Sequence, residues 1–541
     1  MSAAGPASAG RRALARWRAL KGWPLYAALF ALGALGVFAH APYHSQPVLI
    51  AGYVALVWSL DASRRTARPW RAGFARAWWF GAGQFLAGTF WVANAFLVSA
   101  GDHAWLIWAP LILLPGGLAL FWGAAGALYA RFAPSGPERV CVFAALFLIA
   151  ELLRATILSG FPWNLPGHVF AAGGAVSQAA ALAGAFGLSA LVLFAFAAPA
   201  ALAGPGAAWR RAAPALTGLA LLIGAWSFGA IRLADADVRE TGLTVRVVQL
   251  AIEQADKRFE RREAILEDYL DLSAQPGLEA VDVLVWPEGA IPALLLRDRA
   301  LLERIRDRLS HNLILVTGTT RAEAGEGGAP DAYFNALAVL QIDEAVTLRA
   351  VYDKVKLVPF GESNPVHALT RPLGLDTLSQ WGAAYTPGPG ARTLSDTGLP
   401  PFSPLICYEV VYARFAPRGV DRANWLVNVS NDSWYGNTTG PRQHFNQARY
   451  RAIEEGLPMV RAASKGVSGQ IDPYGRPVQV LGLDANAALD FRLLEPRGET
   501  IYARHGDWPW LSVFSLLLLG LGLLLRRSGA ADPADGVRRR V

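Results

Sequence analysis

The sequence predicts a membrane protein made of an α-helical transmembrane bundle of about eight spans and an extracytoplasmic α/β domain. Hydrophobic residues make up 53% of its 541 residues and charged residues only 17%. This balance excludes a disordered chain and is too apolar for an ordinary cytosolic enzyme. Long apolar runs fill the chain up to about residue 233, and strand-length apolar runs follow from about residue 237.

Seven apolar runs precede the α/β region and one follows it, each close to the ~20 residues that cross a bilayer core as a helix. The predicted spans are 24–41, 46–60, 74–98, 104–130, 140–154, 175–203, 213–233 and 508–525. We therefore expect a membrane domain at 1–236, a folded α/β domain at 237–505, and a C-terminal span with a basic tail at 506–541.

Basic residues alternate between the loops that join these spans, as the positive-inside rule requires. Arg and Lys cluster before the first span, after the second and sixth, between the fourth and fifth, and at the end of the chain. The two chain ends are thus predicted to be cytoplasmic and the α/β domain to lie outside. The net charge of +8 then comes largely from basic residues in the loops and chain ends on the cytoplasmic side. No nucleic-acid partner is expected.

The first span could be mistaken for a cleavable signal peptide, because Ala39-His40-Ala41 follows basic residues and an apolar stretch. We favour a retained span, since the basic segment is long and the second span needs a partner. Cleavage would leave the α/β domain on the same side of the membrane.

Two features of the membrane half stand out. The loop Gly160–Asn164 (GFPWN) places Trp163 between helix-breaking residues on the outer side, which fits either a re-entrant turn or a contact with a lipid substrate. Glu151 and Arg154 form an i,i+3 pair inside a span. Such a pair is either a packing clamp or part of a substrate site.

In the outer region, short apolar runs alternate with amphipathic stretches, which predicts an α/β fold whose sheets are covered by helices. The predicted strands are 244–251, 281–286, 313–317, 334–341, 404–407 and 425–429, and the predicted helices are 258–272, 298–309 and 441–455. About 265 residues are ample for a large core.

Three strand ends in this domain carry reactive side chains: Glu288 in VWPEG, the lysines of the segment 352–362 (YDKVKLVPFGE), and Cys407 in LICYE. Sites in α/β sheets form beyond strand ends. A cysteine nucleophile needs a base for its proton and a positive group for the developing oxyanion. Each residue alone is more often structural, but three together after strands favour a catalytic site.

These motifs, in this order, resemble the Glu–Lys–Cys constellation of the nitrilase (carbon–nitrogen hydrolase) superfamily, which implies a nitrilase-like αββα sandwich. The long membrane prefix, the GFPW loop, the trailing span and the segment Asn431–Gly436 (NDSWYG) are similar to the apolipoprotein N-acyltransferases. The resemblance covers nearly the whole chain and is strongest between 281 and 476.

By this resemblance Glu288 would be the general base, Lys354 the oxyanion-stabilising cation and Cys407 the nucleophile. The lysine of the family stands two residues after the tyrosine, here Tyr352, which selects Lys354 over Lys356.

Three further residues match family positions close to the reaction centre: Glu362, Tyr408 and Glu409. They are expected to orient Lys354 and shape the pocket, with simple strand-cap roles as the alternative for Tyr408. The segment 463–466 (ASKG) departs from the family pattern of Thr-Asn-Asn-Gly, which leaves acceptor contacts there open.

The resemblance implies transfer of an acyl chain from a phospholipid donor to the N-terminal amine of a diacylated apolipoprotein acceptor, in a ping-pong cycle with the α/β domain on the periplasmic side of a bacterial inner membrane. No cofactor is expected, since no Gly-rich phosphate loop opens a helix. No metal is expected either, since Cys141 and Cys407 lack metal-site spacing.

Such a transferase must keep water from the acyl intermediate. The apolar, glycine-rich insertion 369–390, with Leu373, Leu375 and Trp381, is predicted to be a membrane-dipping lid. An ordinary surface loop is the alternative.

Two rival functions stay open from the residues alone. A membrane-tethered amidase or nitrilase that hydrolyses a small amide would use the same triad, and only the preceding spans and the GFPW loop argue against it. A transporter or receptor with a vestigial outer domain would not need Glu288, Lys354 and Cys407 intact, and its spans would carry more charged coupling residues.

Overall fold

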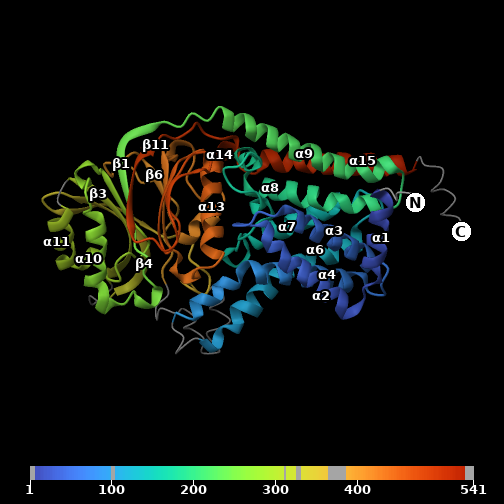
Figure 1. Ribbon diagram of the computed structural model, residues 1–541, viewed down its shortest axis with the longest axis horizontal. Helices are drawn as coiled ribbons and strands as arrows, with labels where there is room; N and C mark the ends of the chain where they lie inside the picture. Colours follow the sequence, from blue (N-terminus) through green and yellow to red (C-terminus); the bar gives the residue numbers. More distant parts are fainter. Residues whose placement is uncertain (1–5, 99–103, 310–311, 325–329, 364–384, 531–541) are drawn as a thin grey trace, which may run out of the picture. The chain divides into compact units, whose positions relative to one another are not determined.

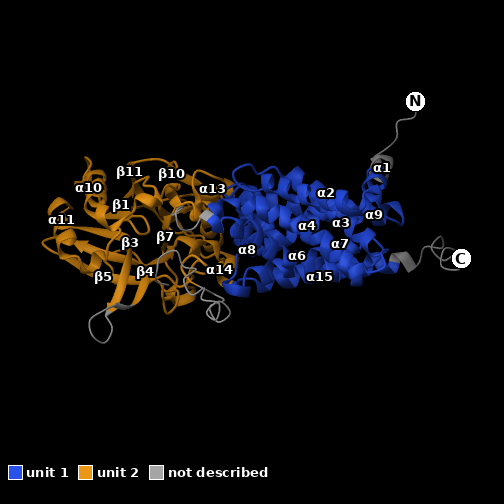
Figure 2. Cartoon of the chain, turned by 90° about the horizontal axis from the view of Figure 1, so that it is seen from below, with its two compact units in different colours: residues 1–93, 105–232, 505–541 blue, residues 94–104, 233–504 orange. Residues whose placement is uncertain are grey.

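The computed structural model describes residues 6–98, 104–309, 312–324, 330–363 and 385–530. The chain forms two compact units, coloured separately in Figure 2. One unit contains residues 1–93, 105–232 and 505–541, and the other contains residues 94–104 and 233–504. The predicted insertion lid falls mostly on 364–384, outside the described residues.

The first unit is helical. Its α-helices are α1 (Pro6–Ala19), α2 (Gly22–Leu35), α3 (Gln46–Ser63), α4 (Pro69–Thr89), α6 (Leu114–Phe132), α7 (Arg139–Arg154), α8 (Ala180–Ala197), α9 (Ala208–Ala234) and α15 (Trp508–Ala530). Among the described residues, five helical stretches are long and apolar enough to cross a membrane: Gly22–Ala39, Ala109–Phe132, Val176–Ala203, Ala208–Ala234 and Trp508–Arg527. The chain is therefore a membrane protein, and the count of eight spans stays a prediction.

Helices α9 and α15 expose large apolar side chains, as helices do that face lipid. The exposed side chains are Trp209, Leu216, Leu219, Ile223, Trp226 and Ile231 on α9, and Trp508, Val513, Leu516, Leu519, Leu523 and Leu524 on α15. In water a surface of this kind would drive association.

The buried pair Glu151–Arg154 acts as a clamp inside this unit. Glu151 accepts a hydrogen bond from the Trp122 indole at 2.7 Å, and Arg154 forms an ion pair with Glu151 and donates to the backbone carbonyls of Phe161 and Trp163. The ion pair therefore holds the GFPW loop in place, which favours the packing role of the two that the sequence left open.

The second unit contains two β-sheets (Figure 1). The first sheet has the order β11-β1-β2-β3-β4-β5 and the second has the order β10-β9-β8-β7-β6. The strands are β1 (Glu240–Gln249), β2 (Val283–Trp286), β3 (Leu313–Ala324), β4 (Pro330–Ile342), β5 (Val346–Asp353), β6 (Phe402–Ile406), β7 (Trp425–Asn431), β8 (Met459–Ser464), β9 (Ser468–Ile471), β10 (Pro477–Leu481) and β11 (Ala487–Leu494).

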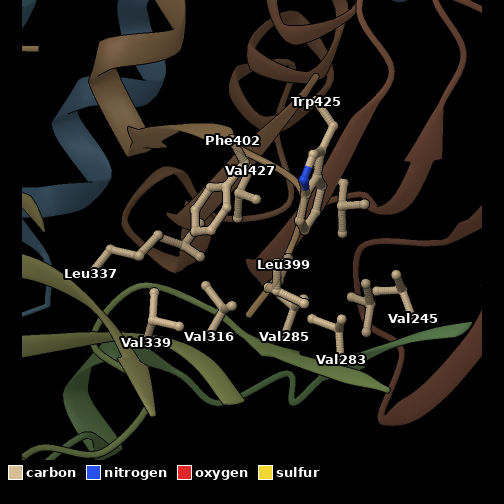
Figure 3. Packing of buried hydrophobic residues seen from close by; sticks show 14 of the residues in the cluster. Val245, Val283, Val285, Val316, Leu337, Val339, Leu399, Phe402, Trp425 and Val427 are labelled. Atoms are coloured by element: carbon tan, nitrogen blue, oxygen red, sulfur yellow. The ribbon is translucent and has the colours of Figure 1, made fainter. Parts of the chain in front are cut away.

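The core lies between the two sheets. Figure 3 shows valines of the first sheet, such as Val283, Val285 and Val316, facing Phe402 and Trp425 of the second. Both sheets contribute β-branched and aromatic residues that are fully or nearly fully buried, as in sheets packed face to face.

Helices cover the outer faces of the sheets. A second apolar cluster joins the first sheet to α10 (Arg262–Ser273) and α11 (Arg299–Leu309). Helix α13 (Gly440–Glu455) lies on the side of the second sheet (Figure 1). The predicted α/β class with helix-covered sheets is confirmed.

Parallel pairing brings the reactive strand ends to common edges. Strands β1, β2 and β3 are parallel to one another, as are β6, β7 and β8. Glu288 follows β2, and Cys407 directly follows β6. Because the carboxyl ends of parallel strands share one edge, loops there present side chains together.

Candidate active site

The structure brings the three predicted catalytic side chains, Glu288, Lys354 and Cys407, to one buried place. The Lys354 ammonium lies 3.1 Å from Glu288 Oε1, and both groups lie close enough to Cys407 for their charges to shift the pKa of its thiol. At most 7% of any of the three residues is exposed. The arrangement puts a carboxylate base and a cation beside one sulfur atom.

Glu288 is held by donors on both carboxylate oxygens. Oε1 accepts from the Asn335 amide at 2.7 Å and from Lys354, and Oε2 accepts from the Asn431 backbone N–H at 2.9 Å. Strand β3 passes so close that a Cβ on Gly318 would lie 2.4 Å from Glu288 Cα. Only glycine fits there, so the backbone of β3 fixes where the carboxylate stands.

Lys354 lies between two carboxylates. Its ammonium donates to Glu288 at 3.1 Å and to Glu362 at 2.9 Å, while Asn335 Nδ2 lies 2.7 Å from Oε1 of each carboxylate. Lys356 instead places its ammonium over the Tyr412 ring, 5.3 Å from the centroid. The residue that faces the carboxylates is therefore Lys354.

Glu409 joins the lysine segment to the cysteine segment. Its Oε2 accepts from the Ile406 N–H at 2.8 Å, just before the cysteine, and its Oε1 accepts from the Val355 N–H at 2.6 Å, just after the lysine. The Tyr352 hydroxyl adds a third bond at 3.0 Å. Burial raises the pKa of Glu409 to about 7 despite these donors. Neighbouring Tyr408 is buried edge-to-face against Tyr412.

Cys407 opens a short 3-10 helix, Cys407–Val411, directly after β6. Its φ of +47° is left-handed, which is unfavourable for a residue with a Cβ. Its sulfur lies 3.9 Å from the Tyr435 hydroxyl, and its carbonyl oxygen lies 3.1 Å from His444 Nε2.

The protonation states follow from these surroundings. Burial and the Glu288 charge raise the pKa of the Cys407 thiol to about 12, with Lys354 opposing. Burial alone would raise the pKa of Glu288, but Lys354 and the hydrogen bonds lower it below its usual value. The two carboxylates hold the pKa of Lys354 well above its usual value, against burial. At neutral pH the resting site thus contains a thiol, a carboxylate and an ammonium, so the thiol needs a base during attack.

We expect the alkylation of Cys407 by iodoacetamide in the folded enzyme to rise steadily with pH up to about 10, without levelling off near 9. Because the thiol pKa is raised, the neutral thiol persists throughout this range. The rate should be followed by mass spectrometry of the Cys407 peptide, with the urea-unfolded chain as control. A plateau near pH 9 or below in the folded enzyme would contradict the predicted resting thiol.

The sequence did not identify several polar residues of the site as functional. Asn335 lies in the predicted strand 334–341, and a polar side chain within that apolar run was the available signal. Tyr435 and Asn431 belong to the segment 431–436, which was noted only as a family motif. Its turn places the Asn431 N–H on Glu288 and the Tyr435 hydroxyl beside the thiol.

Trp163, the remaining predicted supporting residue, belongs to the helical unit. It is 1% exposed and packs against Trp91 with ring centroids 4.7 Å apart. Within that unit Trp163 is a core residue. Its contact with a lipid substrate stays a prediction.

The departing segment 463–466 lies at the edge of the site. The Ser464 hydroxyl accepts from the Lys257 ammonium at 3.1 Å, and Lys465 forms an ion pair with Glu253. Burial lowers the pKa of Lys257 to about 8, while Glu288 opposes this shift. The segment therefore contacts Lys257, which lies near the base, and all three triad residues keep their places.

Within the described residues, Cys407, Asp432 and His444 bring one sulfur, one oxygen and one nitrogen within 4.8 Å of one another. These donors are already engaged. Asp432 Oδ2 accepts from Arg461 at 2.7 Å, and the two His444 nitrogens face Asp432 and the Cys407 carbonyl. The guanidinium of Arg461 supplies the positive charge that a metal ion would bring, so this donor set does not suit a metal.

Two family models match the chain. One, described as the apolipoprotein N-acyltransferase N-terminal domain, matches residues 32–198, and the other, described as carbon–nitrogen hydrolase, matches residues 244–486. Both compact units therefore have known relatives.

Curated relatives match almost the full length of the chain. An apolipoprotein N-acyltransferase of Caulobacter vibrioides is 38% identical over 94% of this chain and 96% of its own length. Enzymes of the same name from Brucella melitensis and Rhodopseudomonas palustris are 37% and 36% identical, each over 94% of this chain and over 97% and 96% of their own lengths.

Proposed function

Because the chain belongs to the apolipoprotein N-acyltransferases, we propose that Cys407 carries the acyl group as a thioester, with Glu288 as the base and Lys354 as the oxyanion-stabilising cation. The chain is a membrane acyltransferase of the carbon–nitrogen hydrolase superfamily and acts in lipoprotein N-acylation. The observation that carries the assignment of residues is the convergence of these three buried side chains from three strand ends.

In the first half-reaction, Glu288 takes the thiol proton while the Cys407 sulfur attacks the ester carbonyl of a phospholipid. The negative charge that develops on the carbonyl oxygen is stabilised by the Lys354 ammonium. As the tetrahedral intermediate collapses, the ester C–O bond breaks and Glu288 returns the proton to the leaving alkoxide. Lyso-lipid and an acyl thioester are the products.

In the second half-reaction, the α-amine of the diacylglyceryl-cysteine of an apolipoprotein attacks the thioester. Glu288 takes a proton from the attacking nitrogen and returns it to the departing sulfur. An amide bond forms, the C–S bond breaks, and Cys407 is again a thiol. The deep burial of Cys407 supports this transfer because it limits attack by water.

We further propose that residues 237–505 lie on the periplasmic side of a bacterial inner membrane, between a membrane domain at 1–236 with seven spans and an eighth span within 506–541. The alternation of basic and non-basic loops supports this topology. Both lipid substrates would then reach the site from the outer leaflet of that membrane.

An acyl adduct on Cys407 is the expected result when the purified enzyme is incubated with phospholipid alone. Mass spectrometry of the Cys407 peptide should show the added mass of a long-chain acyl group, and hydroxylamine or a diacylated lipopeptide should remove it. The peptide with Cys141, which lies in α7, is the internal control.

An adduct formed from a small amide or nitrile but not from phospholipid would instead favour the amidase alternative. The full-length similarity to relatives named as N-acyltransferases supports the transferase over that hydrolase. Absence of any adduct on Cys407 during turnover would reject the thioester.

A further inference from the structure

The backbone at Cys407 is held from both sides by buried side chains. The N–H of Ile406 donates to Glu409 Oε2 at 2.8 Å, and the Cys407 carbonyl lies 3.1 Å from His444 Nε2. Cys407 itself is left-handed, with φ of +47°. A residue with a Cβ does not adopt this conformation without support from its surroundings.

His444 lies on α13 and is fully buried. Its Nδ1 lies 2.9 Å from Asp432 Oδ1 and 3.2 Å from the Arg461 guanidinium. Asp432 is in turn bound by Arg461 at 2.7 Å and by the Ser430 hydroxyl at 2.7 Å. The imidazole is thus fixed by groups from the end of β7, the following turn and β8.

We propose that His444 is a positioning residue, whose Nε2–H holds the Cys407 carbonyl and so fixes the left-handed turn that aims the sulfur at the substrate ester. This inference rests on the proposed role of Cys407 as nucleophile. A carbonyl oxygen only accepts hydrogen bonds, so Nε2 must carry a proton. Nδ1 lies between the Asp432 carboxylate at 2.9 Å and the Arg461 guanidinium at 3.2 Å.

A different role for His444, as the base that deprotonates Cys407, is disfavoured by geometry. One ring nitrogen of His444 lies within 4.8 Å of the Cys407 sulfur. However, Nε2 faces the Cys407 carbonyl oxygen at 3.1 Å, and Nδ1 faces Asp432. The sulfur instead lies 3.9 Å from the Tyr435 hydroxyl, and the Glu288 carboxylate is close enough to raise the pKa of the thiol. His444 therefore acts on the backbone of the nucleophile.

Two substitutions separate the two ring nitrogens. In His444→Gln the side-chain amide N–H₂ stands near the position of Nε2, so a donor to the Cys407 carbonyl is kept. In His444→Asn the shorter amide reaches only the position of Nδ1, so the partner of Asp432 is kept and the carbonyl loses its donor. Gln447→Leu, three residues further along α13, is the matched control, since the buried amide of Gln447 has no hydrogen-bond partner among the residues that the structure describes.

The full-length enzyme in detergent micelles should be assayed with phospholipid and a diacylated lipopeptide. We expect His444→Asn to lose kcat by roughly 10²-fold, the scale of a misplacement of about 1 Å, with the KM for phospholipid little changed. The kcat of His444→Gln should stay within about tenfold of the wild-type value, and the kcat of Gln447→Leu should equal the wild-type value. The slow step in His444→Asn should be formation of the acyl-Cys407 adduct.

Each other outcome overturns the inference. A His444→Asn variant as active as His444→Gln would show that the carbonyl contact is not needed, and losses that only follow the melting temperature would make His444 structural. Failure of both variants to fold, with Gln447→Leu folded, leads to the same conclusion. The wild-type adduct keeps the two assignments apart, because its absence would reject Cys407 as nucleophile whatever the variants do.

Discussion

Replacing Cys407 with alanine is expected to lower the rate of N-acylation by at least roughly 10⁴-fold, as loss of a covalent nucleophile does in other acyl-transfer enzymes. In the proposed cycle the acyl group crosses from donor to acceptor only on this sulfur. Cys407 is the one cysteine among the described residues of the unit that holds the site, since Cys141 belongs to α7 of the helical unit. The measurement is the initial rate of conversion of diacylated to triacylated lipopeptide by mass spectrometry.

Two further variants sharpen this test. Cys407→Ser keeps the size and polarity of the side chain, but its hydroxyl is a much weaker nucleophile, so we expect it to be as inactive as Cys407→Ala while melting near the wild-type temperature. Cys141→Ala should retain full activity. A Cys407→Ala enzyme that acylates at the wild-type rate would mean that the acyl group is never carried by this residue.

The sequence predicted strands that contain a long apolar run and missed strands whose apolar runs are short or broken by polar residues, whether those strands are buried or exposed. Six predicted strands correspond to β1, β2, β3, β4, β6 and β7. By contrast, β10 is almost wholly exposed, and β8 contains the fully buried Arg461. An arginine in the sequence gives no sign that it will lie in a core, because its partner Asp432 is 29 residues away along the chain.

Polar residues limit the prediction of the membrane helices in the same way as that of the strands. Helices α2, α8, α9 and α15 are apolar along much of their length, and apolarity alone identifies them as spans. The predicted span 74–98 overlaps α4, which begins at Pro69 and ends at Thr89. Arg71 and Arg76 lie in this helix, and their charge weakens the apolar signal there.

The site shows why its first members could be predicted and its other members could not. Glu288, Lys354 and Cys407 each follow a strand, so the local sequence indicates that they lie at the edge of a sheet where strands end. Asn335 and His444 act through partners far away along the chain, Asn335 through a carboxylate 47 residues away and His444 through a carbonyl 37 residues away. Tertiary packing alone brings these groups together.

The second large effect is expected from Lys354→Met, which should lower activity by at least roughly 10³-fold because the oxyanion loses its cation. The same change leaves Glu288 and Glu362 facing each other in a buried site, joined by the Asn335 amide. Removing one partner of a buried ion pair costs about 3–5 kcal/mol of stability, so the melting temperature at pH 8 should fall.

The pH dependence of this loss has a definite sign. In the wild type the pKa of Glu288 is lowered, so its ionisation stabilises the fold above the unfolded pKa, and that stability is lost as the pH falls through the folded pKa. Without the ammonium the pKa of Glu288 rises, so the variant is penalised most at high pH. The gap in melting temperature between the two proteins should therefore narrow between pH 8 and pH 5.

The double variant Lys354→Met/Glu362→Gln separates stability from catalysis. Neutralising Glu362 removes one of the two unpaired carboxylates, so most of the lost melting temperature should return at pH 8, while the acylation rate should stay as low as in the single variant. If activity returned together with stability, the ammonium would serve only to hold the fold. A single variant as stable as the wild type at pH 8 would mean that solvent screens the two carboxylates, contrary to their burial.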